Sequence, residues 1–174
     1  MKIKKTLQAE LIWAYAKPGG FQRSQIYEST ATKAEKEIFR SSLKDFLFQN
    51  VFTAFYNKRV SEMELIQVLD FLILRNKQKA YLKGGELRFG NAQKFVNLYL
   101  KGMWVAGFLD VPPHFPVDRV MINRLGISQN WTNMNKKQYE NIICVAKLKI
   151  GIDNEYMSIA EWEAEEYQRS YIAK

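Results

Sequence analysis

The sequence has one cysteine, one histidine and no long apolar run among its 174 residues, and each shortage excludes a class of protein. A single thiol, Cys144, can form neither an intrachain disulfide nor a zinc or iron–sulfur site built from cysteines. No stretch approaches the roughly 20 apolar residues that span a bilayer, and residues 1–5 lack the apolar run of a signal peptide. We therefore expect a soluble cytoplasmic protein with no membrane partner and no metal site.

Charge is distributed unevenly along the chain. Residues 151–174 contain six acids and two basic residues, a net charge of −4, whereas the whole chain has a formal net charge of +8. Residues 1–150 therefore carry +12 by difference. A basic surface of this size favours a polyanionic partner, because each neutralised phosphate releases condensed counterions. An ordinary solvated basic surface is equally compatible with the charge alone.

The spacing of apolar residues is helical along almost the whole chain, and no strand pattern of useful length competes with it. With 47% hydrophobic and 14% aromatic residues, the chain has enough apolar surface to fold. We expect an all-α protein in which residues 1–174 form one compact helical domain of about five to seven helices. An alternative division places residues 1–80 and 81–174 in two packed halves around a cleft.

Local signals predict several helix boundaries. Capping boxes of the form Ser/Thr-x-x-Glu begin at Thr32, Ser61 and Ser158. Glycine and proline mark the expected helix ends and connectors. The expected elements are an N-terminal helix over 6–16 closed by 17–20, a turn-rich connector over 77–88, and helices over 91–107, 116–126, 135–149 and 158–171.

A lysine follows a glycine at the start of one of these helices. Gly90 permits a tight turn and lets a phosphate approach the unpaired N–H groups of a helix N-terminus. Lys94 is expected in the first turn, where the helix dipole and partial burial disfavour the charged amine. A neutral amine in this position is suited to nucleophilic attack.

Chain geometry allows Asp118 to return to Lys94. The expected helix rises roughly 20 Å beyond Lys94 at 1.5 Å per residue, and the ten residues 108–117 can span at most about 33 Å. Three prolines in this segment favour an extended backbone. Asp118 then has two interpretations, as a carboxylate partner of Lys94 or as a helix cap without a catalytic role. The residues alone favour the cap.

Two segments around this pair resemble a known family. Gly90-Asn91-Ala92-Gln93-Lys94 opening a helix, followed by Pro116-Val117-Asp118 before the next helix, is similar to the helix-hairpin-helix DNA glycosylase superfamily. That family has Gly-x-Gly-x-Lys at the first place and a Val-Asp pair at the second. The resemblance covers about residues 80–127, and Ala92 stands where the family has its second glycine. It implies a helix-hairpin-helix element and a DNA glycosylase, with or without abasic-site lyase activity, that acts on a damaged or modified base.

The resemblance also implies roles for individual residues. Lys94 would be the nucleophile that attacks the sugar C1′, and Asp118 would stabilise the positive charge that develops on the sugar. The backbone of residues 87–92 would hold a DNA phosphate, with a monovalent cation on its carbonyls as the one cofactor implied. A prokaryotic protein of this kind would be nucleoid-associated. The implied DNA contacts are Gly84, Gly85, Arg88, Gly90, Asn91, Gln93, Lys101 and Arg119.

Four further residues are candidates for the same site. Lys101 lies seven residues after Lys94, near the same helix face, and is an alternative nucleophile. Trp104 and Phe108 can line a base pocket by stacking, with core packing as the alternative. His114 lacks partners at metal-ligand spacing, so we expect an exposed loop residue or a phosphate contact. It is also a candidate for the base pocket.

Two other functions are compatible with these residues. The first is a non-catalytic helix-hairpin-helix module that binds DNA without cutting it. The second is a helical protein-interaction domain whose partner is an acidic protein. Neither alternative requires the pairing of Lys94 with Asp118.

Overall fold

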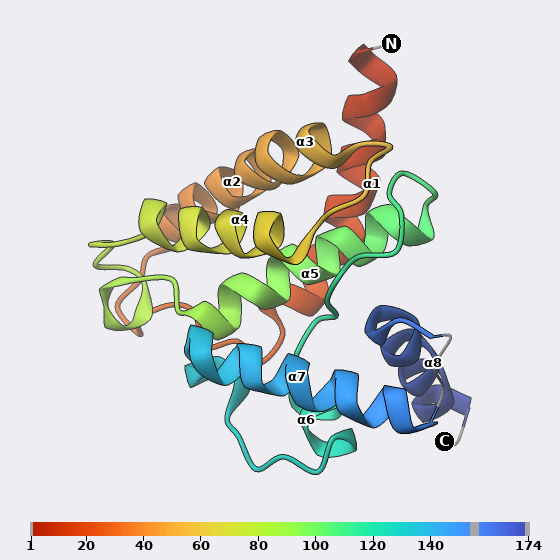
Figure 1. Cartoon of the computed structure of the whole chain (residues 1–174). Helices are drawn as coiled ribbons and strands as arrows, with labels where there is room; N and C mark the ends of the chain where they lie inside the picture. The colour runs from red at the N-terminus through yellow and green to blue at the C-terminus, as the bar shows by residue number, and fades with distance from the viewer. Residues whose placement is uncertain (1, 154–156, 173–174) are drawn as a thin grey trace.

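The computed structural model describes residues 2–153 and 157–172, and the chain over these ranges is helical (Figure 1). Seven of its helices have six residues or more, which confirms the all-α prediction and the predicted number. Within these ranges, β-type pairing is limited to an isolated bridge between Tyr27 and Leu82. The helices are α1 (Lys2–Phe21), α2 (Lys33–Leu47), α4 (Glu62–Arg75), α5 (Phe89–Val105), α6 (Arg119–Arg124), α7 (Lys136–Asp153) and α8 (Ile159–Ile172). The shorter elements are the π-helical turn η1 (Phe48–Phe52), α3 (Thr53–Phe55), and the 3₁₀ turns η2 (Lys83–Gly85) and η3 (Trp131–Asn133).

The three predicted capping boxes are present. At the start of α2, the Glu35 N–H donates to the Thr32 hydroxyl while the Thr32 N–H donates to the Glu35 carboxylate. Ser61 forms the same pair of bonds at the start of α4, and Ser158 at the start of α8. Each box satisfies backbone donors that the helix itself leaves unpaired.

The predicted end of α1 is wrong. The helix continues through Pro18 to Phe21 instead of closing at residues 17–20. The two glycines of this segment pack directly on α5, where a Cβ on Gly20 would lie 2.3 Å from the Phe95 ring. Close packing between the two helices therefore outweighs the weak helix propensity of proline and glycine.

The predicted hairpin at residues 87–92 is not confirmed. α5 already begins at Phe89, so Gly90 and Ala92 lie inside its first turn. The connector from α4 to α5 is residues 76–88, and its only helical turn is η2. α6 likewise begins later than predicted, at Arg119 rather than near Pro116.

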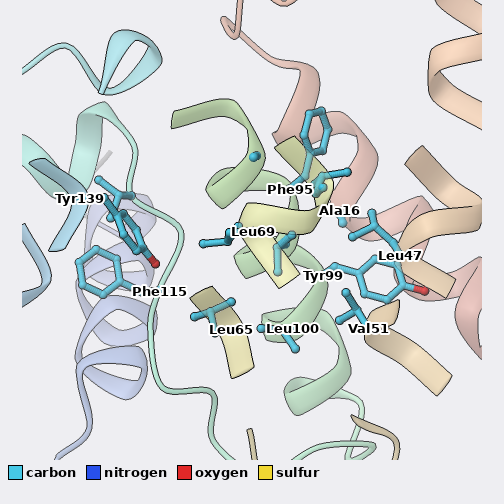
Figure 2. Close-up of a cluster of buried hydrophobic side chains, with 14 of the residues drawn as sticks. Ala16, Leu47, Val51, Leu65, Leu69, Phe95, Tyr99, Leu100, Phe115 and Tyr139 are labelled. Atoms are coloured by element: carbon cyan, nitrogen blue, oxygen red, sulfur yellow. The ribbon is translucent and has the colours of Figure 1, made fainter. Parts of the chain in front are cut away.

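α5 lies at the centre of the fold. In Figure 1, α2, α3 and α4 lie above α5, whereas α6, α7 and α8 lie below it. α5 contacts α1, η1, α4, η3 and α7. One cluster of buried side chains extends from Leu47 and Val51, past Leu100, to Phe115 and Tyr139 on the other side (Figure 2). α5 thus joins the N-terminal helices to the C-terminal ones.

Gly90 brings α5 into contact with η3. A Cβ at this position would lie 1.8 Å from the carbonyl oxygen of Trp131. Only a hydrogen fits in that space, so the absence of a side chain is required by close backbone approach rather than by a turn. This contact sets the position of Trp131 beside the first turns of α5.

Gly90→Ala should therefore destabilise the protein. The methyl group must displace the backbone of η3, because no flexible side chain is there to yield, and we expect a loss of about 3 kcal/mol or more in the free energy of unfolding. Urea unfolding measures this loss. Gly151→Ala in α7 is the matched control, since nothing lies within 4 Å of its Cβ, and it should change stability by less than about 1 kcal/mol, in the stabilising direction. Equal stability of the two variants would contradict the close approach.

Candidate functional site

One face of α5 is polar although it is buried. This face holds Gly90, Gln93, Lys94, Asn97 and Lys101, which recur every three or four residues with Gln93 and Lys94 side by side. Gln93 and Asn97 are 0% exposed and Lys94 is 7% exposed. Buried polar groups must be paired, and their partners come from the C-terminal part of the chain.

The side-chain amide of Gln93 binds both the N–H and the carbonyl of Val117. Its Oε1 accepts from the Val117 N–H at 3.0 Å, and its Nε2 donates to the Val117 carbonyl at 2.6 Å. Nε2 also donates to the Gly90 carbonyl at 3.0 Å, and Oε1 accepts from Asn97 at 3.2 Å. All four hydrogen bonds that an amide can form are made. The segment before α6 is therefore fixed in register against α5.

This register determines where Asp118 lies. Asp118 is the N-cap of α6, and its Oδ1 accepts from the N–H groups of Val120 at 2.9 Å and Met121 at 3.3 Å. The capping interpretation is thus confirmed. Asp118 is also close enough to Lys94 to stabilise its charged form, although no direct ion pair joins the two residues within the described ranges.

The Lys94 amine lies in an aromatic and partly desolvated environment. Its Nζ is 4.4 Å from the centre of the Trp131 ring. Burial lowers the pKa of Lys94, and the positive charge of Arg23 lowers it further, while Asp118 acts in the opposite direction. The balance favours the neutral amine more than in a free lysine, as a nucleophile requires.

A chain of hydrogen bonds leads from the Gln93 amide toward the surface. The Asn97 amide donates to the Tyr139 hydroxyl at 2.9 Å, and the same hydroxyl lies 2.8 Å from Nδ1 of His114. Because the amide nitrogen can only donate, the hydroxyl proton is free to pair with Nδ1. Nε2 of His114 then faces the Glu62 carboxylate at 3.6 Å, too far for a hydrogen bond. Glu62 in turn pairs with Lys147.

The environment of His114 keeps its ring neutral. Burial lowers the pKa of His114 to about 4; Glu62 opposes this change, and Lys147 adds to it. The predicted exposed position of His114 is wrong, since the residue is 3% exposed. The single histidine of the chain is an internal hydrogen-bonding residue.

Lys101 is paired with an acid of α8. Its Nζ lies 2.6 Å from the Glu163 carboxylate, and the two side chains are 12% and 5% exposed. Burial raises the pKa of Glu163, Lys101 lowers it, and Asp118 raises it. Glu163 is therefore paired with a cation of α5 and within electrostatic reach of the cap of α6. Lys101 is bound in a structural pair and is not a free amine in this conformation.

Several of the residues predicted to contact DNA are turned inward instead. Gln93 and Asn91 are buried, at 0% and 1% exposed, and Gly90 is covered by Trp131. Arg88 donates to the carbonyls of Ser24 and Gln25, at 3.1 and 2.8 Å. Side chains and backbone in these positions serve internal packing rather than a phosphate surface.

The remaining predicted DNA contacts are more accessible. Gly84 and Gly85 have left-handed backbones with φ of 75° and 78° and open space around them. The Gly84 N–H donates to the Glu28 carboxylate at 2.8 Å, so an internal acid occupies the place proposed for a phosphate. Arg119, the first residue of α6, is exposed.

The predicted base pocket does not assemble around Lys94. Trp104 is ten residues further along α5, about 15 Å away at 1.5 Å per residue. Phe108 lies beyond the end of α5 and stacks on Tyr56, with ring centroids 5.6 Å apart. The aromatic side chain next to Lys94 is Trp131 of η3. A pairing of Lys94 with an aromatic residue 37 positions away has no local signal.

The structure also bears on cavities, metals and membranes. Four surface hollows of 520, 240, 350 and 450 Å³ are lined by described residues, and neither Lys94 nor Asp118 lines any of these four. In the described ranges, no group of three or more His, Cys, Asp or Glu residues is arranged to hold a metal ion. Nor is any helix of these ranges both long and apolar enough to cross a bilayer.

Gln93→Met should destabilise the protein. Methionine fills nearly the same volume but leaves the Val117 N–H and carbonyl unpaired in the interior, so we expect a loss of about 2–4 kcal/mol in the free energy of unfolding. Gln67→Met on the exposed face of α4 is the matched control and should change stability by less than about 0.5 kcal/mol. Urea unfolding of both variants tests this. A Gln93 variant as stable as the Gln67 variant would show that the Val117 contacts contribute little.

His114 should make the protein sensitive to acid. The ordinary pKa of 6.5 applies to the unfolded chain and the value of about 4 to the folded one. As pH falls from about 6.5 to about 4, the unfolded chain takes up a proton that the folded chain does not, so stability is lost in this window. Between pH 7.5 and pH 4.5 the loss is roughly 2–3 kcal/mol.

Urea unfolding at these two pH values, for the native chain and for His114→Gln, measures the stability that is lost through His114. The carboxylates titrate in both proteins, and His114 is the only histidine, so the difference between the two pH dependences isolates it. The variant should lose less stability on acidification. Identical pH dependences would contradict a neutral buried ring.

The chain matches no protein-family model, no curated protein and no solved structure. Its function must therefore be argued from the geometry of the site itself.

Proposed function

We propose that this protein is a DNA glycosylase with abasic-site lyase activity, in which Lys94 is the nucleophile and Asp118 stabilises the charge that develops on the sugar. One observation carries the proposal: the Lys94 amine is desolvated against Trp131 within electrostatic reach of the Asp118 carboxylate. The basic residues 1–150 support a DNA substrate. The likeness of residues 80–127 to helix-hairpin-helix glycosylases supports the chemistry.

The proposed reaction begins with a target nucleotide flipped out of the duplex. The lone pair of neutral Lys94 forms a bond to C1′ as the glycosidic bond breaks, and the base leaves with the bonding electrons and takes up a proton. The amine loses a proton and the sugar ring opens, which gives a Schiff base between Nζ and C1′. Loss of a C2′ proton then expels the 3′ phosphate, and water hydrolyses the Schiff base to return the amine.

Asp118 is suited to electrostatic stabilisation rather than to attack. Its Oδ1 is held by two backbone N–H groups of α6, so the carboxylate has a fixed orientation. A preoriented negative charge near C1′ would stabilise the positive sugar without reorganisation during the reaction. The helix cap and the proposed catalytic role therefore use the same geometry.

Borohydride trapping on duplex DNA with an abasic site tests the nucleophile. Reduction of the Schiff base by hydride converts it to a stable amine, so the native chain should become covalently linked to DNA. Lys94→Gln should reduce the linked fraction by about 10²-fold or more. Lys101→Gln, which removes the alternative nucleophile, should retain trapping at saturating DNA concentration. Equal trapping by Lys94→Gln would exclude Lys94, and DNA binding without trapping by the native chain would favour a non-catalytic module.

Asp118→Asn separates the capping role of this residue from its proposed catalytic role. Asparagine caps helices about as well as aspartate, so stability should change little. The loss of negative charge should slow base release by about 10²-fold or more, as measured on duplexes that carry a panel of base lesions. A variant that is as stable and as active as the native chain would leave Asp118 with the capping role alone.

A further inference from the structure

Two acids of α8 pair with cations on α5 and α6. Glu163 lies 2.6 Å from Lys101, and Glu166 lies 3.5 Å from Nε of Arg124. Lys101 also lies 5.2 Å from the centre of the Tyr167 ring. α8 thus covers Lys101, whereas Arg124 stays 46% exposed and shares Glu166 with Arg169 of α8, whose guanidinium lies 3.0 Å from that carboxylate.

These cations lie near the proposed reactive site. Lys101 follows Lys94 by seven residues on one face of α5, about 10 Å along the helix. Arg124 ends the short helix that Asp118 caps. Asp118 is also near enough to Glu163 to raise the pKa of that acid. α8 therefore occupies the basic surface that adjoins Asp118.

The acidic character of α8 contrasts with the rest of the chain. Its described residues include four glutamates and one arginine, whereas residues 1–150 carry +12. Carboxylates spaced along a helix can hold cations in the way that the phosphates of a nucleic acid backbone do. The burial of Glu163 carries a desolvation penalty that its ion pair offsets only in part, so an external phosphate can compete for Lys101.

We infer that Lys101 and Arg124 form part of the surface that binds the DNA backbone, and that α8 occupies this surface in the free protein, with Glu163 and Glu166 in place of two phosphates. DNA binding displaces α8 from these cations. The inference rests on the proposed function for the identity of the polyanion. The displacement of α8 from Lys101 does not depend on the chemistry at Lys94.

Removal of single charges from α8 tests the inference. The probe is a labelled duplex with a tetrahydrofuran abasic analogue, which cannot form a Schiff base, and affinity is measured by fluorescence anisotropy between 50 and 200 mM salt. Glu163→Gln should bind roughly 3- to 10-fold more tightly and steepen the salt dependence by about 0.9 in log–log slope, the value for one more phosphate contact. Glu166→Gln should act in the same direction.

The control lies on the same helix. Glu165 pairs only with Arg169 of α8 among the described residues, so Glu165→Gln removes the same charge without freeing a cation of α5 or α6. It should leave affinity and salt slope unchanged. Adding Lys101→Gln to Glu163→Gln restores the native net charge and should abolish the gain.

Equal shifts in the Glu163 and Glu165 variants, a gain that persists without Lys101, or no binding of the duplex by any variant would each overturn the inference. Thermal unfolding of each variant identifies any that fails to fold, and Glu166→Gln provides the test if Glu163→Gln is one of these. Trapping on abasic DNA reports on Lys94 separately. Trapping without a gain in affinity would overturn the role of α8 alone, and a gain without trapping would overturn the lyase alone.

Discussion

The pairing of the Gln93 amide with the backbone of Val117 is the interaction on which the C-terminal part of the structure depends. A side-chain amide that binds both the N–H and the carbonyl of one residue acts as a short piece of backbone, and it permits only one register. Because the pair is buried and complete, breaking it would leave several polar groups unpaired in the interior. The position of Asp118 relative to Lys94 follows directly from this register. So does the position of Phe115, which packs against Trp162 of α8 with ring centroids 6.0 Å apart.

The burial of Lys94 opposes stability and favours reactivity for the same physical reason. Removal of water from an ammonium group costs free energy, and the protein recovers part of it through the face of the Trp131 ring and the field of Asp118. The remaining penalty appears as a shift toward the neutral amine. A lysine whose only role was to hold a helix in place would be better served by a direct carboxylate partner, as Lys101 is by Glu163. The difference between these two lysines on one helix face is the main reason to assign chemistry to Lys94.

A structural feature can be predicted from the sequence where it depends on neighbouring residues. It cannot be predicted where it depends on residues distant in the chain. The capping boxes at Thr32, Ser61 and Ser158 are local, and all three were predicted. The cap at Asp118 was predicted as one of two roles, and the other role stays a proposal. The continuation of α1 through Pro18 depends on contacts with α5, more than 70 residues away. Gln93 was assigned to DNA because the pattern around it could not show that Val117 would satisfy its amide.

The ion pairs of α8 link the charge distribution of the chain to the proposed site. Burial raises the pKa of Glu163 and Asp118 raises it further, whereas the ion pair with Lys101 lowers it, so the loss of Lys101 would disfavour the charged carboxylate. A phosphate that takes Lys101 leaves Glu163 near Asp118 without its cation. Two like charges in a partly desolvated site repel strongly, and the repulsion is relieved when Glu163 moves into water or takes up a proton. If DNA displaces α8 as inferred, the carboxylate that caps α6 would contribute to this displacement through its repulsion of Glu163.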